Sequence, residues 1–127
     1  MIEEIDVVFL HARRSQETAR WYNETLGIPL AFCTLDFSWQ EFDMSEASPT
    51  RFAIEEAPDA PSSVEEQRIM ISFRVKDLRS FVKELESRGV QFTGTPRIQR
   101  EGQSLFATLK DPEGNWIQLS QRAATSH

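Results

Sequence analysis

Residues 102–119, GQSLFATLKDPEGNWIQL, contain two apolar stretches joined by a tight turn. Residues 111–114, DPEG, have the composition of a turn, because the proline presets its own φ and the glycine can adopt a positive φ. After the turn, Ile117 and Leu119 alternate with other residue types, which predicts a strand with two different faces. Gln118 lies in the middle of this strand, where a buried amide needs a hydrogen-bond partner.

The order of predicted elements occurs twice along the chain. In the first half, a strand over 7–10 and a helix from Gln16 to about Leu26 precede three short strands. In the second half, a strand over 69–75 and a second helix again precede three strands. The sequence therefore predicts one domain of tandem βαβββ modules: module one at about 4–56, a linker at about 57–67, module two at about 68–121 and a tail at 122–127.

Short polar residues and glycines indicate where both helices begin and end. Ser15 is the expected N-cap of the first helix and Asp77 that of the second, since such side chains accept hydrogen bonds from free backbone N–H groups. Gly27 and Gly89 are the expected stops, since glycine readily adopts the left-handed conformation that follows a helix.

The duplicated unit, the DPEG turn before its last strand and the stretch WYNETLGI (21–28) resemble the vicinal oxygen chelate superfamily. This superfamily includes glyoxalase I, bleomycin-resistance proteins, extradiol dioxygenases and fosfomycin-resistance enzymes. The resemblance covers residues 5–121 and implies an α+β fold in which tandem βαβββ modules form a cupped mixed sheet, with the active site inside the cup. Because this scaffold supports many chemistries, the resemblance alone does not assign a function.

The resemblance also indicates where a metal would bind. In the metal-dependent members, three or four His, Gln or Glu side chains from the first and last strands of each module hold one divalent ion. The matching positions here are Val7, Ala53, Met70 and Gln118, with Glu55 in place of Ala53 if the register differs. A divalent ion needs several oxygen or imidazole ligands, and three of these four side chains are apolar. We therefore expect no metal cofactor; the alternative is Zn, Ni, Mn or Fe held by another ligand set.

Side-chain alternation predicts which residues face the cup. Arg74, on the strand predicted over 69–75, is expected to face the cup. An inward arginine needs an anionic partner, which is either a ligand carboxylate or a protein carboxylate such as Glu55. The alternation leaves the facing of Trp39 and Trp116 open. The expected small-molecule pocket has mostly apolar walls with a few polar groups, and its ligand-binding residues are His11, Ser72, Arg74, Gln118, Met70, Phe9 and Trp39.

Composition limits the classes of partner. The chain has 127 residues and a net charge of −6, which argues against a nucleic-acid backbone as the ligand. Its single cysteine, Cys33, rules out a disulfide framework and a cysteine-rich zinc site. No apolar run is long enough to span a membrane, and the acidic start MIEEIDVV lacks the basic region of a secretory signal, so a cytoplasmic protein is expected.

Three functions are compatible with these observations. The first is a metal-free protein that binds a small organic molecule in the cup. The alternative is an enzyme of the same superfamily, of lyase, dioxygenase or transferase type, which uses a divalent metal or His11 as acid and base. A purely structural protein would require a filled cup, and several polar residues are expected to point inward. A homodimer is also expected, because short sheets leave edges and apolar surface to cover.

Overall fold

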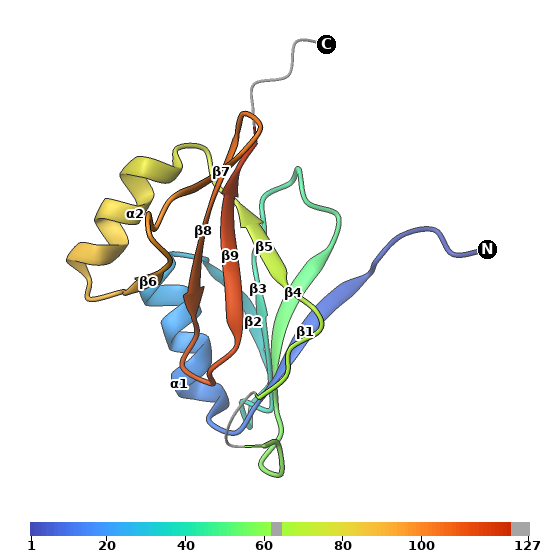
Figure 1. Ribbon diagram of the computed structural model, residues 1–127. Helices are drawn as coiled ribbons and strands as arrows, with labels where there is room; N and C mark the ends of the chain where they lie inside the picture. Colours follow the sequence, from blue (N-terminus) through green and yellow to red (C-terminus); the bar gives the residue numbers. More distant parts are fainter. Residues whose placement is uncertain (62–64, 123–127) are drawn as a thin grey trace. The chain divides into compact units, whose positions relative to one another are not determined.

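The computed structural model describes residues 1–61 and 65–122, and the chain divides into two compact units, Met1–Ser63 and Val64–His127. Each unit contains one β-sheet and one helical region (Figure 1). Residues 62–64 of the predicted linker and residues 123–127 of the predicted tail lie outside the described residues. No helix within the described residues is long and apolar enough to cross a membrane.

Unit 1 has a four-stranded mixed sheet with the strand order β1-β4-β3-β2. Strands β1 and β4 are parallel, whereas the other two neighbouring pairs are antiparallel. The three strands predicted after the first helix are all present. In chain order the elements are β1 (Val7–Ala12), α1 (Ser15–Arg20), the π-helical turn η1 (Trp21–Thr25), β2 (Leu30–Cys33), β3 (Trp39–Phe42) and β4 (Arg51–Glu56).

An aromatic core joins the helical region of unit 1 to one face of its sheet. The ring of Tyr22 in η1 lies 5.2 Å from that of Phe52 and 6.0 Å from that of Phe42. The two phenylalanine rings stack at 5.2 Å, and all three side chains are buried. Burying a large apolar side chain contributes about 1.5–3 kcal/mol, so this cluster fixes which face of the sheet is covered.

The first helix begins differently from the prediction. It starts at Ser15 with Arg14 as its N-cap, and no side chain caps it. The N-cap prediction for Ser15 is wrong because its buried hydroxyl donates to the carbonyl of Phe37, 3.3 Å away. The predicted stop at Gly27 is confirmed: its φ is +80°, and the next N–H, that of Ile28, bonds to the carbonyl of Tyr22.

Unit 2 has a five-stranded sheet in which β5, β9, β8 and β6 are neighbours in that order and β7 also pairs with β8. The short strand β7 was not predicted, because its residues, Gln-Arg-Glu, show no apolar alternation. It forms a hairpin with β8 through Gly102, whose φ is +62°. In chain order the elements are β5 (Ile71–Arg74), α2 (Leu78–Ser87), β6 (Phe92–Thr93), β7 (Gln99–Glu101), β8 (Ser104–Lys110) and β9 (Trp116–Gln121).

Helix α2 follows its prediction closely. The Asp77 carboxylate accepts hydrogen bonds from the backbone N–H of Ser80 at 3.2 Å and from its hydroxyl at 2.9 Å, and these bonds lower the pKa of Asp77. The apolar face is buried at Leu78, Val82 and Leu85 and packs on β8 and β9. Gly89 follows the last turn with a φ of +89°, as predicted.

The turn at residues 111–114 is built around one carboxylate. Asp111 is 5% exposed, and its side chain accepts hydrogen bonds from the backbone N–H groups of Glu113 (2.9 Å) and Asn115 (2.8 Å). The side-chain amide of Asn115 donates a third bond at 3.0 Å. Gly114 has a φ of +88°, so the predicted turn is confirmed and its direction is fixed by Asp111.

The two units share one plan. In each, the first strand pairs in parallel with the last, and a helical region follows the first strand. The predicted α+β class with two βαβββ modules is therefore confirmed, with β7 as one additional strand.

Candidate functional site

The candidate site in unit 1 is the sheet face that points away from α1, here called the open face of unit 1. Exposure alternates along β1: Leu10 and Ala12 are turned toward the core, whereas Phe9 and His11 are exposed. Register places Phe9 beside Ala53 and His11 beside Glu55, so these pairs share the face. Side chains on this face come from all four strands, and they are Val7, Phe9, His11, Phe32, Trp39, Glu41, Arg51, Ala53 and Glu55.

An aromatic pair occupies the middle of this face. The rings of Phe9 and Trp39 lie 5.2 Å apart at an angle of 56°, a favourable tilted contact. The imidazole of His11 lies 5.8 Å from Phe9. The structure thus determines the facing of Trp39, which the sequence left open, and it brings together three predicted site residues.

His11 and Glu55 are the polar pair beside these rings. The His11 Nε2 lies 3.1 Å from the Glu55 Oε1, and the two side chains are 58% and 42% exposed. Such an exposed pair contributes little to stability, so its significance lies in orienting the imidazole.

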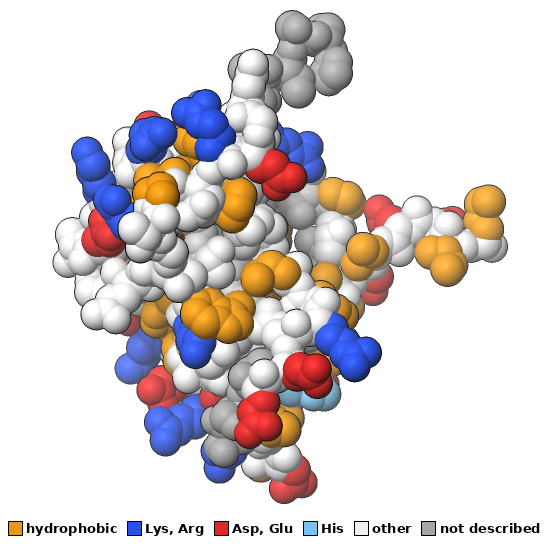
Figure 2. All heavy atoms as spheres, in the orientation of Figure 1, with side chains coloured by type: hydrophobic (Ala, Val, Ile, Leu, Met, Phe, Trp, Pro, Cys, Tyr) orange, Lys and Arg blue, Asp and Glu red, His pale blue; other side chains and the backbone are white. Residues whose placement is uncertain are grey.

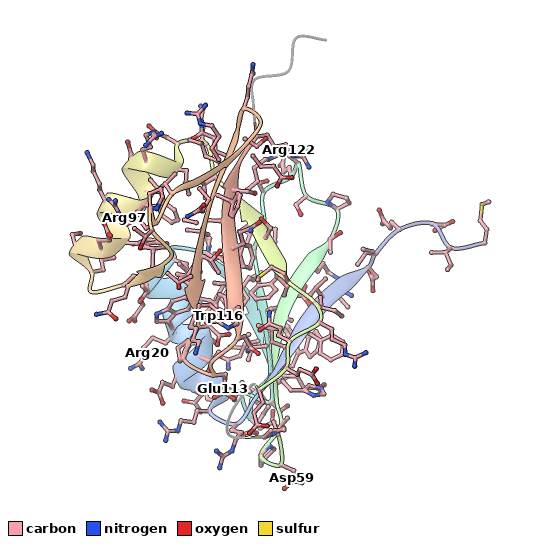
Figure 3. The ribbon with its side chains drawn as sticks, viewed as in Figure 1. Arg20, Asp59, Arg97, Glu113, Trp116 and Arg122 are labelled. Carbon is pink, nitrogen blue, oxygen red and sulfur yellow. The ribbon has the colours of Figure 1, made fainter. Side chains whose placement is uncertain are left out.

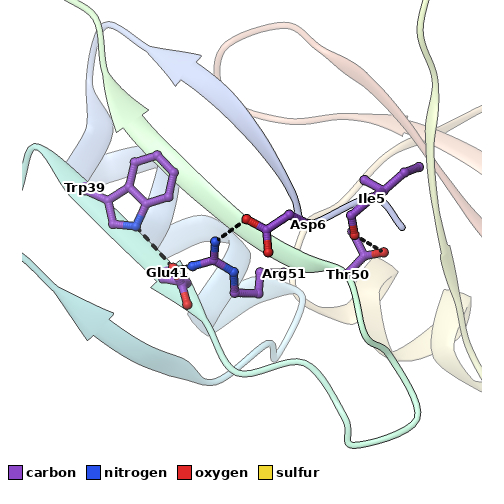
Figure 4. A network of polar contacts seen from close by, with 6 residues as sticks. All are labelled: Ile5, Asp6, Trp39, Glu41, Thr50 and Arg51. Carbon is purple, nitrogen blue, oxygen red and sulfur yellow. Dashed lines mark hydrogen bonds and ion pairs between the residues drawn. The ribbon is translucent and has the colours of Figure 1, made fainter. Parts of the chain in front are cut away.

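A second polar network fixes the orientation of Trp39 (Figure 4). The Trp39 Nε1 donates to the Glu41 Oε1 at 3.3 Å, and the Arg51 Nη1 donates to the same oxygen at 2.9 Å. The Arg51 Nη2 donates to the Asp6 Oδ2 at 2.8 Å, and this bond is the main cause that raises the pKa of Arg51. A further bond ties the chain near Asp6 to β4, from the Thr50 hydroxyl to the Ile5 carbonyl.

Glu41 and Arg51 were not among the predicted site residues. A signal was present for Glu41, because it lies two residues after Trp39 on a predicted strand and therefore shares its face. Arg51 could not be found this way, since its contact with Glu41 depends on the pairing of β3 with β4.

The candidate site in unit 2 is the corresponding sheet face, here called the open face of unit 2. On β9, Ile117 and Leu119 are each 1% exposed on the core side, which leaves Gln118 on the open face. Register places Gln118 between Ser72 of β5 and Thr108 of β8. The predicted residues Ser72, Arg74 and Gln118 therefore lie on one face.

The polar side chains on this face have few partners within the protein. The Ser72 hydroxyl donates to the Ser120 hydroxyl at 3.0 Å rather than to Gln118. The Gln118 amide is half-buried and makes no hydrogen bond with the described part of the chain. Arg74 is exposed and has no ion pair within residues 1–61 and 65–122. Among the described residues, the Gln118 amide and the Arg74 guanidinium therefore have no hydrogen-bond or ion-pair partner.

Met70 lies just outside this arrangement. The predicted strand over 69–75 is shorter, because β5 begins at Ile71, and Met70 precedes it at 47% exposure. The strand neighbour of Gln118 is Ser72, not Met70. The segment before β5 is held instead by Gln67, whose amide accepts from the N–H of Trp116 at 2.8 Å and donates to its carbonyl at 2.7 Å.

Trp116 lies at the start of β9, close to the turn (Figure 3). Register places it on the same face as Gln118, and the ammonium group of Lys110 lies 4.5 Å from the centre of its ring. This distance is typical of a cation–π contact. In the same orientation, Figure 2 shows hydrophobic side chains reaching the surface between charged side chains of both signs.

The residues at the expected metal-ligand positions do not fit a divalent ion. Val7 and Ala53 carry no donor atom, and Ala53 is fully buried. Gln118 offers one neutral amide, which is a weak ligand alone. Within residues 1–61 and 65–122, no three His, Cys, Asp or Glu side chains lie close enough together to hold a metal ion.

Two units of βαβββ plan, each with one covered and one open sheet face, define a duplicated α+β protein. The chain belongs to the Glyoxalase/Bleomycin resistance protein/Dioxygenase superfamily, whose family profile matches residues 4–119. A search of curated proteins gave no significant match.

Solved structures share this fold at low sequence identity. A glyoxalase/dioxygenase from Nostoc punctiforme has a TM-score of 0.76 and 12% identity, covering 95% of this chain and 92% of that one. TnmS3, an antibiotic binding protein from Streptomyces sp. CB03234, has a TM-score of 0.74 and 20% identity, covering 96% and 98%. A lactoylglutathione lyase from Agrobacterium tumefaciens has a TM-score of 0.72 and 12% identity, covering 94% of each chain. At these identities the likeness establishes the fold and not the activity.

Proposed function

We propose that this protein binds a small organic molecule on the open faces of its sheets and does so without a resident metal ion. The observation that supports this most directly is the aromatic pair on the open face of unit 1. Phe9 is 43% exposed although it contacts Trp39, so an apolar ring is available to a ligand. Polar groups held in fixed positions surround it, as in most small-molecule sites.

The metal-free part of the proposal rests on the donor set. A divalent ion requires several oxygen, nitrogen or sulfur ligands around one point, and Val7 and Ala53 supply none. The similar Streptomyces protein is described as antibiotic binding, which is consistent with a binding role on this fold.

A second candidate function is catalysis with His11 as acid and base. The observation that favours it is the 3.1 Å contact between the His11 Nε2 and the Glu55 Oε1, because a carboxylate can hold an imidazole in one orientation and stabilise its protonated form. This function would require turnover that His11→Asn abolishes while ligand affinity is retained.

The proposal is tested by ligand-detected NMR with a library of small aromatic and aliphatic compounds. Hits for the wild-type protein should be lost in Phe9→Ala and Trp39→Ala, since both remove the aromatic pair. Leu35→Ala is the control, because this apolar side chain is fully exposed in the turn between β2 and β3. A library without hits, or hits that Phe9→Ala and Trp39→Ala retain, would contradict binding at this face.

A further inference from the structure

Two carboxylates flank the aromatic pair on the open face of unit 1. Glu41 lies two residues after Trp39 on β3, and Glu55 is the strand neighbour of Trp39 on β4. Both therefore share the face of the indole ring. Any molecule that contacts the Phe9 and Trp39 rings lies close to both acidic side chains.

Each carboxylate retains an unused oxygen. The Glu41 Oε1 accepts the bonds from Trp39 and Arg51, and the Glu55 Oε1 contacts His11. The Oε2 atom of either residue accepts no hydrogen bond from the described part of the chain. Because the Oε1 contacts hold both side chains in place, the Oε2 atoms are positioned acceptors rather than freely rotating ones.

The charge on this network is negative. Its charged groups are the carboxylates of Asp6, Glu41 and Glu55 and the guanidinium of Arg51, which sum to −2, and a protonated His11 would bring the sum to −1. The faces of aromatic rings also attract cations. The aromatic rings and the carboxylates therefore both favour a cationic ligand over an anionic one.

We propose that the open face of unit 1 selects a small molecule that combines an apolar ring with a protonated nitrogen. The ring packs on Phe9 and Trp39, and the nitrogen donates to the Oε2 atoms of Glu41 or Glu55. This inference rests on the proposed function, since it names the class of ligand that the same face takes.

Three compounds with one phenyl ring and a two-carbon chain test this selection: 2-phenylethylamine, 2-phenylethanol and 3-phenylpropionate. They are cationic, neutral and anionic at pH 7.5, and their affinities are measured by NMR titration at low salt. The amine should bind about fivefold more tightly than the alcohol, and the propionate more weakly than either. In Glu55→Gln the advantage of the amine should fall to about twofold, because the shape is kept and the charge is removed.

Glu17→Gln is the matched control. It removes one negative charge from the same unit, on α1 and outside the open face, and should leave the amine-to-alcohol ratio unchanged. Equal affinities for the amine and the alcohol, or an unchanged amine-to-alcohol ratio in Glu55→Gln, would overturn the inference. The proposed function would still stand in that case if Phe9→Ala abolishes binding of the compounds. Binding of none of the three compounds would also overturn the inference, and the library screen would then judge the proposed function by itself.

Discussion

The Asp111 carboxylate should be the most sensitive polar group in the second module. Asp111→Ala removes an acceptor that is 5% exposed and that receives two backbone N–H groups and one side-chain amide. Leaving the two N–H groups of Glu113 and Asn115 without this acceptor costs about 1–1.5 kcal/mol each. Glu113 and Asn115 are half-buried, so water replaces the lost hydrogen bonds only in part. The expected decrease in the free energy of unfolding is therefore about 2–3 kcal/mol.

The free energy of unfolding is measured by urea denaturation followed by circular dichroism, with the thermal midpoint as a second readout. A loss of about 2–3 kcal/mol corresponds to a fall of about 10 °C for a chain of this length. Asp111→Asn keeps one acceptor oxygen and should lose only about 1 kcal/mol.

Asp59→Ala is the control for this experiment, since it removes an exposed carboxylate from another turn and should change stability by less than about 0.5 kcal/mol. An Asp111→Ala protein as stable as the control would show that the turn does not depend on this carboxylate.

Three further predictions concern the pKa of an exposed carboxylate, metal binding at position 118 and the oligomeric state. Hydrogen bonds from the Ser38 hydroxyl and N–H and from the Thr34 hydroxyl lower the pKa of Asp36 to about 2, so their stabilisation should persist above about pH 4 and be lost as pH falls toward 2. NMR titration should give a midpoint near 2, and Ser38→Ala should move it toward 3.8; an unshifted wild-type carboxyl would refute this. Gln118→Glu should reduce stability by about 1 kcal/mol, because the carboxylate is half-buried, and Zn or Ni should not restore the melting temperature. A clear rise with metal would show that a metal site persists there. Light scattering should give twice the chain mass of 14.6 kDa, since the edge strand β2 exposes Leu30 and Phe32, and a monomer mass at all concentrations would contradict the homodimer.

Local chemistry explains which elements the sequence predicted well. The turn at 111–114 and the cap at Asp77 each depend on a side chain that bonds to backbone N–H groups two to four residues away. Such contacts form within one short segment, so the residue types alone are sufficient to predict them. Ser15 has the same chemistry, yet its hydroxyl bonds to a carbonyl 22 residues away, which no local pattern predicts.

In the candidate site, too, features set within one strand were predictable from the sequence and contacts between strands were not. Alternation along single strands was enough to place Phe9, His11, Ser72, Arg74 and Gln118 on open faces. The partner of each residue was not predictable, because it depends on register between strands that are far apart in the sequence. The pairing of Ser72 with Gln118 is one such contact, because β5 pairs with β9 across about 46 residues.

The sequence by itself determined the family, the duplicated order of strands and helices, and the side of β1, β5 and β9 that could face a ligand. The family follows from the resemblance of the duplicated unit, the DPEG turn and residues 21–28, whereas the other two follow from residue periodicity and from turn and cap chemistry, which act over a few residues. Only the tertiary structure decided that Trp39 packs on Phe9, that Glu41 and Arg51 hold its indole in place, and that Glu55 pairs with His11. Each of those contacts joins different strands, and the hydrogen bonds that align the strands are set by the packing of the whole sheet on its helix.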